Sequence, residues 1–122
     1  MKNESALKRY LKRKCGSRGW ECIALENKIG NGWPDRTILV PVFYLSIGHP
    51  YTAFLEIKDG RPAKSKHLTE QVLTLLKLRS MGYYADLAID KNEISISLDY
   101  IEVLSSNPKR EPVYFSDIQQ YL

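Results

Sequence analysis

The sequence lacks the features that mark secreted, membrane and zinc-binding proteins. Its two cysteines, Cys15 and Cys22, are too few for a disulfide framework, and no C-x-x-C motif or His/Cys cluster indicates a zinc site. No apolar run approaches the roughly twenty residues of a membrane span. The opening MKNESALKRYLKRK also lacks the apolar stretch of a secretory signal. The sequence therefore predicts a soluble cytoplasmic protein with reduced thiols and no membrane partner.

Low-complexity tracts, internal repeats and linker-like segments are missing as well. What remains is an ordinary globular composition, with 43% hydrophobic and 26% charged residues in a chain of 122. A chain of this length can bury a real core. We therefore expect a single domain over residues 1–122.

Positive charge is present in excess and is unevenly distributed. The net charge is +4, and basic residues crowd the first eighteen positions and the segment 58–66. Such clusters suit a polyanion, so we expect nucleic acid as the partner. A solvated helix face explains the basic N-terminal segment almost equally well. The residues expected to contact DNA are Arg9, Lys12, Arg13, Arg61, Lys64 and Lys66.

The hydrophobic pattern predicts an αβββαβ order followed by a C-terminal tail. Because the short segment SIGHP joins the second and third strands, these two are expected to pair antiparallel, and Pro41 indicates an early end to the second. In the tail, the alternation in EISISL predicts a strand over 93–98, then a short helix after Ser97 and a terminal helical turn. The predicted core elements are helices over 4–15 and 66–81 and strands over 20–27, 35–45, 51–58 and 83–89.

Three charged residues interrupt the predicted strands. Asp35 opens one strand, and Glu56 and Lys58 lie two residues apart on one face at the end of the next. Charge in a buried strand is costly unless it is paired or binds a metal. If the strands are neighbours, Asp35 and Glu56 can share Mg²⁺ or Mn²⁺, with the carbonyl of Ile57 as a third oxygen. Lys58 would then stabilise charge on an attacked phosphate or orient a water, which predicts a phosphodiester-cleaving site.

Each of these signals also has an ordinary structural explanation. Pro-Asp is a common turn dipeptide, and Glu-x-Lys on a strand is often a cross-strand ion pair. Glu4 in a first helical turn usually only interacts with the helix dipole. The combination of Asp35, Glu56 and Lys58 in order, followed by a basic loop and an amphipathic helix, favours the site.

The segments NESALKRYLKR, GWPDRTIL and AFLEIKDGRPAKSKHLTEQVLTLLKLRSMGYYADLAI together resemble the VRR-NUC domain of the PD-(D/E)XK nuclease superfamily. The resemblance covers about residues 3–90 and rests on Gly-x-Pro-Asp, Glu-x-Lys and a later helix carrying glutamine, in that order. It implies an α/β, restriction-endonuclease-like αβββαβ core, with a mixed central sheet flanked by helices. Residues from about 91 to 122 would form a short C-terminal extension.

The resemblance also implies roles for individual residues. Asp35 and Glu56 would bind Mg²⁺ or Mn²⁺, Lys58 would be catalytic, and no small-molecule cofactor would be needed. Glu4 would be an auxiliary acid that reaches the metal, directly or through a water, and Gln71 would support the site. A chain of this length is similar to the stand-alone VRR-NUC proteins of phages and bacteria, which are associated with dimers that act on branched DNA. A phage-encoded protein of this kind would work in the host cytoplasm.

Two functions of different class follow. The first is a metal-dependent DNA endonuclease that hydrolyses phosphodiester bonds and is structure-specific for branched DNA such as four-way junctions. The second is a DNA-binding or accessory module with a nuclease fold and no independent activity. The set of Asp35, Glu56 and Lys58 favours the endonuclease, because binding alone does not need charges at those strand positions.

A homodimer is also predicted. One site cuts one strand, so resolving a junction takes a second copy, and twofold dimers are the commonest oligomers. We expect the segment from about residue 93 to contribute to the interface, unless it only caps its own domain. The apolar residues that indicate this are Tyr100, Ile101, Val113, Tyr114, Phe115, Ile118 and Tyr121.

Overall fold

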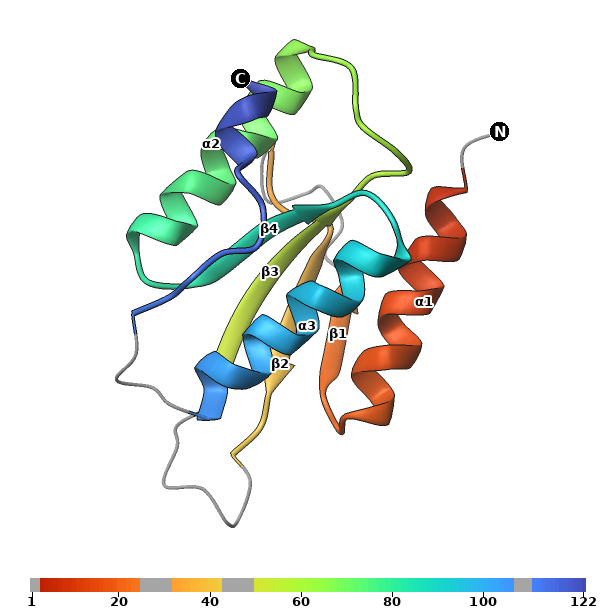
Figure 1. Cartoon of the computed structure of the whole chain (residues 1–122), viewed down its shortest axis with the longest axis vertical. Coiled ribbons are helices and arrows are strands. Elements are labelled where there is room, and N and C mark those ends of the chain that lie inside the picture. Colours follow the sequence, from red (N-terminus) through yellow and green to blue (C-terminus); the bar gives the residue numbers. More distant parts are fainter. Residues whose placement is uncertain (1–2, 25–31, 43–49, 107–110) are drawn as a thin grey trace.

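The fold has the element order that the sequence predicts for its core. A computed structural model describes residues 3–24, 32–42, 50–106 and 111–122, so parts of two predicted strands (25–27 and 43–45) lie outside it, as do residues 107–110, which SSNPKREP predicts to be in an exposed turn. The described sheet is flanked by helices on both faces (Figure 1), which confirms the predicted α/β class and αβββαβ order. The elements are α1 (Glu4–Ser17), β1 (Glu21–Ala24), β2 (Arg36–Val40), β3 (Tyr51–Ile57), α2 (Lys66–Ser80), β4 (Tyr84–Ala88), α3 (Lys91–Ser106) and the 3₁₀ helix η1 (Ile118–Tyr121).

The described strands form one mixed sheet in the order β1-β2-β3-β4. The pairs β1–β2 and β2–β3 are antiparallel, as predicted for the latter, and β3–β4 is parallel, with α2 as the crossover. As Pro41 indicates, β2 ends at Val40. Arg36 lies opposite Leu55, so the residue before β2 reaches the end of β3. This register decides where Asp35 lies.

Helices α1 and α3 cover one face of the sheet (Figure 1). Their buried residues recur every three or four positions, which directs one stripe of each helix to the sheet. The stripe on α1 is Leu7, Leu11 and Cys15, and that on α3 includes Ile94, Leu98 and Ile101; both pack against Ile38, Val40, Ala53, Leu55 and Ile57.

Helix α2 and the 3₁₀ helix η1 cover the opposite face. The Ser65 side chain caps α2 by accepting a hydrogen bond from the Leu68 N–H (3.0 Å). Gln71 shares the buried side of α2 with Leu68 and Val72, which points its amide at the sheet rather than at solvent. The apolar contacts of this face are Phe54, Leu68, Val72, Leu75, Leu78, Ala85, Leu87, Ile118 and Tyr121.

The prediction of a strand over 93–98 is wrong, because these residues belong to the long helix α3. Ile94, Ile96 and Leu98 alternate as a strand would, but the burial continues at helical spacing through Leu104. The Asp90 carboxylate also accepts a hydrogen bond from the Glu93 N–H (2.8 Å), which begins the helix.

The C-terminal segment packs largely onto its own domain. Ile101 and Ile118 are fully buried and Tyr121 nearly so, all within the two hydrophobic clusters of the same chain. The predicted interface role is therefore wrong for these three residues. Tyr100, Val113, Tyr114 and Phe115 stay at least partly exposed.

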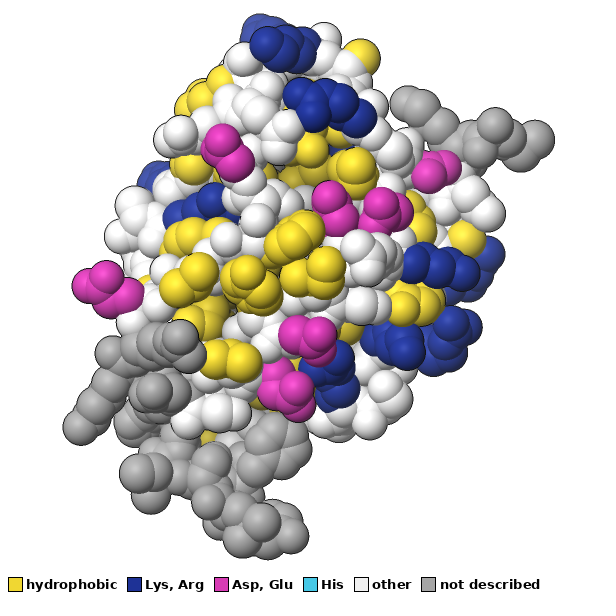
Figure 2. Space-filling view, in the orientation of Figure 1, with side chains coloured by type: hydrophobic (Ala, Val, Ile, Leu, Met, Phe, Trp, Pro, Cys, Tyr) yellow, Lys and Arg dark blue, Asp and Glu magenta, His cyan; other side chains and the backbone are white. Residues whose placement is uncertain are grey.

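Basic and hydrophobic side chains gather in different regions of the surface. Lys and Arg side chains gather along α1, whereas hydrophobic side chains gather between α3 and the C-terminal segment (Figure 2). Within the ranges that the structure describes, no helix is both long and apolar enough to cross a membrane.

Candidate active site

The start of β2 and the end of β3 bring Asp35 and Glu56 together. The Asp35 N–H donates to Glu56 Oε1 (3.1 Å), and Asp35 Oδ2 accepts from the Ile57 N–H (3.1 Å). These reciprocal bonds hold both carboxylates in place although 21 residues separate them in sequence. The start of β2 and the end of β3 are thus neighbours, and the two acids lie side by side.

Glu56 is a buried acid whose charge its neighbours offset only in part. Its side chain is 1% exposed. Burial raises the pKa of Glu56 to about 8, the charge of Asp35 adds to this rise, and Lys58 opposes it. Such a carboxylate ionises readily at neutral pH only when a further positive charge is nearby.

Gln71 supports Glu56 from α2. Gln71 Nε2 donates to Glu56 Oε2 (2.9 Å), and the Gln71 side chain is buried. Its other amide atom, Oε1, is buried and has no hydrogen-bond partner in the described part of the chain. An unpaired buried oxygen is costly and is open to a ligand or a water.

Two ammonium groups flank the carboxylate pair. Lys58 Nζ lies 3.6 Å from Glu56 Oε2. On the other side, Lys8 Nζ lies 3.9 Å from Asp35 Oδ2 and 3.2 Å from Glu4 Oε1. The two lysines therefore partly neutralise the acids and add positive charge where an anionic substrate would approach.

Glu4 lies near the site but is separated from the strand carboxylates by Lys8. The Asn3 N–H donates to the Asp59 carboxylate, which ties the start of α1 to the loop after Lys58. Glu4 is thereby positioned beside the site, while its contact is an ion pair rather than a direct approach to Asp35 or Glu56.

The oxygen atoms at this junction fit a hard divalent cation. Asp35 and Glu56 supply carboxylate oxygens, which two backbone hydrogen bonds hold beside each other. Among the described residues, no group of three or more His, Cys, Asp or Glu side chains is placed to hold a metal. Two carboxylates with the remaining positions left to water and phosphate are characteristic of Mg²⁺ sites rather than of all-protein cages.

The basic residues of α1 divide between two sides of the helix. Arg9 and Lys12 line a hollow between α1 and the start of β2. Arg13 instead stacks over the Tyr10 ring, 5.5 Å from its centroid. The structure thus groups Arg9 with Lys12 but separates Arg13 from them.

The second predicted DNA-binding group lies in the loop before α2. Arg61 donates to Gln120 Oε1 (2.7 Å) and stacks over the Tyr121 ring, 5.2 Å from its centroid. Lys64 and Lys66 are exposed. Arg61 is therefore engaged by the C-terminal helix, whereas the two lysines present their charge to solvent.

Lys8 and Arg36 are site residues that sequence reasoning missed. Lys8 follows Glu4 by four residues, a spacing that pairs charges on a helix, and this was the available signal. Arg36 NH1 donates to the Asp35 carbonyl (2.9 Å), which only the folded chain reveals.

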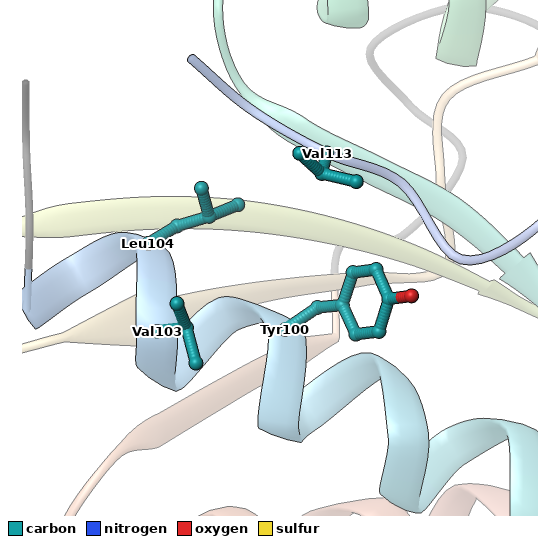
Figure 3. Close-up of a pocket in the computed structure, with 4 residues that line it drawn as sticks. All are labelled: Tyr100, Val103, Leu104 and Val113. Carbon is teal, nitrogen blue, oxygen red and sulfur yellow. The ribbon is translucent and has the colours of Figure 1, made fainter. Parts of the chain in front are cut away.

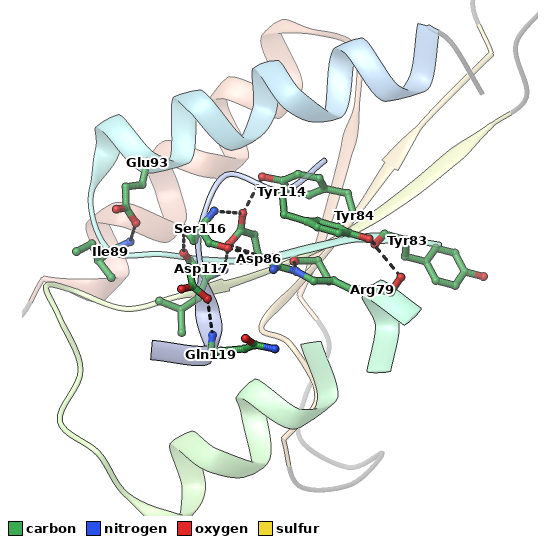
Figure 4. Close-up of polar contacts among 12 residues, drawn as sticks. Arg79, Tyr83, Tyr84, Asp86, Ile89, Glu93, Tyr114, Ser116, Asp117 and Gln119 are labelled. Atoms are coloured by element: carbon green, nitrogen blue, oxygen red, sulfur yellow. Dashed lines mark hydrogen bonds and ion pairs between the residues drawn. The ribbon is translucent and has the colours of Figure 1, made fainter. Parts of the chain in front are cut away.

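A second buried ionic cluster is structural (Figure 4). Arg79 lies 3.2 Å from Asp86, stacks 4.1 Å from the Tyr114 ring centroid, and donates to two backbone carbonyls. The Asp86 carboxylate also accepts from the Tyr84 hydroxyl (2.8 Å) and the Ser116 N–H (3.1 Å). With these partners filled, the cluster joins α2, β4 and the C-terminal segment and leaves little capacity for a ligand.

Comparison with known proteins agrees with this fold. No family model matches the sequence, and no curated protein matches it in sequence. A solved structure described as "VRR_NUC domain" matches with a TM-score of 0.63 and 17% identity, covering 80% of this chain and 95% of the other. The chain therefore has the fold of a VRR_NUC domain, as the sequence resemblance predicts.

Proposed function

We propose that this chain is a nuclease that hydrolyses phosphodiester bonds in DNA with Mg²⁺ or Mn²⁺. The observation that carries the proposal is the Asp35–Glu56 pair, in which a buried carboxylate lies against a second one where the two central strands of a VRR_NUC-type sheet begin and end. A divalent cation would offset the charge that burial disfavours in Glu56. The shared fold supports the reaction class by analogy.

Each residue then has a proposed role. Asp35 and Glu56 would hold the cation, with the Ile57 carbonyl as a further oxygen, and the hydrogen bond from Gln71 would orient Glu56. The bound cation would polarise the scissile phosphate and lower the pKa of an attacking water. Lys58 would stabilise the negative charge that grows on the phosphate during attack.

Glu4 has a less direct role in this proposal. Its ion pair with Lys8 holds that lysine close to Asp35. Glu4 would act as an auxiliary acid through water rather than as a direct ligand. Arg9, Lys12, Lys64 and Lys66 would attract the DNA backbone.

Metal-dependent cleavage of plasmid and branched DNA tests the proposal. Asp35→Ala and Glu56→Ala should each abolish cleavage and remove the rise in melting temperature caused by Mn²⁺, since each loses a ligand oxygen. Lys58→Ala should keep that rise but lose about 10²–10³-fold in rate. The matched control is Lys77→Ala, which removes an exposed lysine from α2.

The outcomes separate the two candidate functions. Full activity in Asp35→Ala or Glu56→Ala would contradict the assignment of the site. DNA binding without cleavage under any divalent metal would support the accessory module instead. A panel of duplex, flap, splayed and four-way DNAs in the same assay tests the preference for branched DNA.

We propose a homodimer as the active form, because two strands of a junction must be cut. The supporting surface is an apolar hollow of about 280 Å³ between α3 and the C-terminal segment (Figure 3). It is lined by Tyr100, Val103, Leu104 and Val113, and the two valines are 48% and 52% exposed. Exposed apolar side chains that line a hollow are typical of an interface.

A further inference from the structure

A basic pocket lies beside the carboxylate site, between α1 and the β1–β2 edge of the sheet. Its volume is about 300 Å³. The described residues that line it include four cations and no carboxylate. They are Ser5, Lys8, Arg9, Lys12, Cys22, Ala24 and Arg36.

The local geometry explains why these cations converge. Lys8 and Lys12 are four residues apart on α1, so they project from one side of the helix. Arg36 lies opposite Ala24 in the β1–β2 pairing, and Cys22 is two residues before Ala24 on the same face of β1. The helix and the strand edge therefore enclose the pocket from two sides.

The lining residues have the chemistry that binds a phosphate diester. A guanidinium donates two parallel hydrogen bonds to phosphate oxygens, and lysines add point charges. Ser5 adds a hydroxyl donor. Four positive groups would repel a cationic ligand, and they would bind a neutral acceptor more weakly than an anion.

Two residues of the pocket contact Asp35, so the pocket adjoins the Asp35–Glu56 site. Lys8 lines the pocket and also lies 3.9 Å from Asp35 Oδ2. Arg36 lines it too, while its NH1 donates to the Asp35 carbonyl. An anion in the pocket would therefore lie next to a phosphate bound at the carboxylates.

We propose that this pocket binds a backbone phosphate of the nucleic-acid strand, next to the phosphate that is cleaved. The proposal rests on the proposed nuclease function. It assigns Lys8, Arg9, Lys12 and Arg36 to positioning the strand, so that the scissile phosphate reaches Asp35 and Glu56.

Cys22 provides a reporter inside the pocket. It is partly exposed, whereas Cys15, the other cysteine of the chain, is fully buried. A hydrogen bond from Cys15 lowers the pKa of Cys22; burial opposes this, and the charges of Arg36 and Lys12 lower the pKa further. A lower pKa increases the thiolate fraction that reacts with a disulfide reagent, and a bound strand would cover this partly exposed side chain.

The experiment measures the rate at which an anionic aromatic disulfide reagent modifies Cys22, with and without a 15-nucleotide DNA. EDTA is added to the wild type so that the proposed cleavage does not consume the oligonucleotide, and a parallel series uses Glu56→Gln with Mg²⁺. We expect saturating oligonucleotide to slow modification about tenfold or more. In Lys12→Gln/Arg36→Gln, the oligonucleotide concentration that gives half protection should rise at least tenfold. Comparing rates within each variant removes the direct effect of the substitutions on the thiol.

Matched controls isolate the pocket from general electrostatics. Lys14→Gln/Lys77→Gln removes the same charge outside the pocket, since Lys14 stacks over Tyr10 and Lys77 is exposed on α2. Protection should persist in this control. Lys12→Gln alone changes an exposed side chain and keeps the test valid if Arg36→Gln impairs folding.

Three results would overturn the proposal. One is oligonucleotide binding, seen by fluorescence anisotropy, that leaves Cys22 unprotected. Another is equal loss of protection in the control pair. The third is equal protection by inorganic phosphate at the same phosphate concentration, which would indicate a small-anion site.

The cleavage assay separates this proposal from the proposed function. Cleavage without protection of Cys22 would overturn the pocket assignment and leave the nuclease standing. Protection without cleavage under any divalent metal would retain the strand-binding pocket and overturn the nuclease.

Discussion

The charged form of Glu56 is stabilised by hydrogen bonds and destabilised by burial, and a single substitution can show which effect is larger. The residue is buried, accepts hydrogen bonds from the Asp35 N–H and from Gln71, and lies against a second acid. Those bonds favour the charged form of Glu56. Burial and the Asp35 charge disfavour it more strongly, because the pKa is raised to about 8. Without a cation, ionising Glu56 therefore destabilises the folded state.

In EDTA, Glu56→Gln should stabilise the protein, and more so at about pH 8.5 than at about pH 5. The folded-state pKa of about 8 lies above the ordinary value of 4.5, so the folded protein keeps a proton that the unfolded chain releases. Wild-type stability therefore falls as pH rises through this window, by on the order of a few kcal/mol. The variant has no such ionisation, and Gln71 can turn its unpaired Oε1 toward the new amide.

Urea unfolding at both pH values measures this difference. The control Glu111→Gln removes an exposed carboxylate and should behave as the wild type does. A Glu56→Gln variant that is less stable than wild type at both pH values would mean that the hydrogen bonds outweigh the buried charge.

At the scale of elements, the Arg79–Asp86 cluster explains why the C-terminal segment has a fixed place. Asp86 on β4 accepts from the Ser116 N–H, and Arg79 at the end of α2 donates to the Ser116 carbonyl (Figure 4). The last turn then places Ile118 and Tyr121 against α2. The Arg79–Asp86 pair thus ties the C-terminal segment to α2 and β4, which lie 30 or more positions earlier in the sequence.

Asp86→Ala should destabilise the fold by about 3–5 kcal/mol, because Arg79 would keep a mostly buried charge without its partner. Asp99→Ala is the matched control, since it also removes an aspartate paired with an arginine, Arg18, at 2.9 Å. Asp99 is 65% exposed, so its loss should cost less than about 1 kcal/mol. Equal losses in urea unfolding would show that the buried cluster contributes no more than a surface pair.

At the scale of the whole molecule, the chain presents two unlike surfaces. The α1 side is basic and adjoins the carboxylate site, whereas the α3 side carries the apolar hollow (Figures 2 and 3). Separate surfaces would allow the protein to bind DNA and a second copy at the same time.

Light scattering at micromolar concentration should find a dimer. Val103→Glu/Val113→Glu should convert the dimer to a monomer, because the new glutamates of the two copies would be buried and would repel one another across a twofold interface. Both valines are about half exposed, so the fold should persist. The control Leu73→Glu/Met81→Glu changes two exposed apolar residues on the α2 side and should remain dimeric. A wild-type monomer that still resolves four-way DNA would defeat the dimer proposal, while one that only nicks would leave the nuclease proposal intact.

The sequence by itself determined the order of the core elements and the identity of the unusual charges. Periodicity is a local property, so spacing alone predicted a helix over 66–81 and a strand over 51–58, and the structure has them at Lys66–Ser80 and Tyr51–Ile57. Asp35, Glu56 and Lys58 were recognisable because charge inside an apolar run is itself a local anomaly. The same local reasoning failed at 93–98, where a short window of apolar residues fits both the two-residue period of a strand and the spacing of a helix.

Only the tertiary structure decided which residues those charged side chains contact. The contact of Lys8 with Asp35, the burial of Glu56 under Gln71 and the approach of Arg36 to Cys22 join residues that are 14 or more positions apart in the printed sequence. Their distances depend on strand register and helix placement. The pKa of a carboxyl group depends on burial and on charges within a few ångströms, neither of which spacing along the chain can fix.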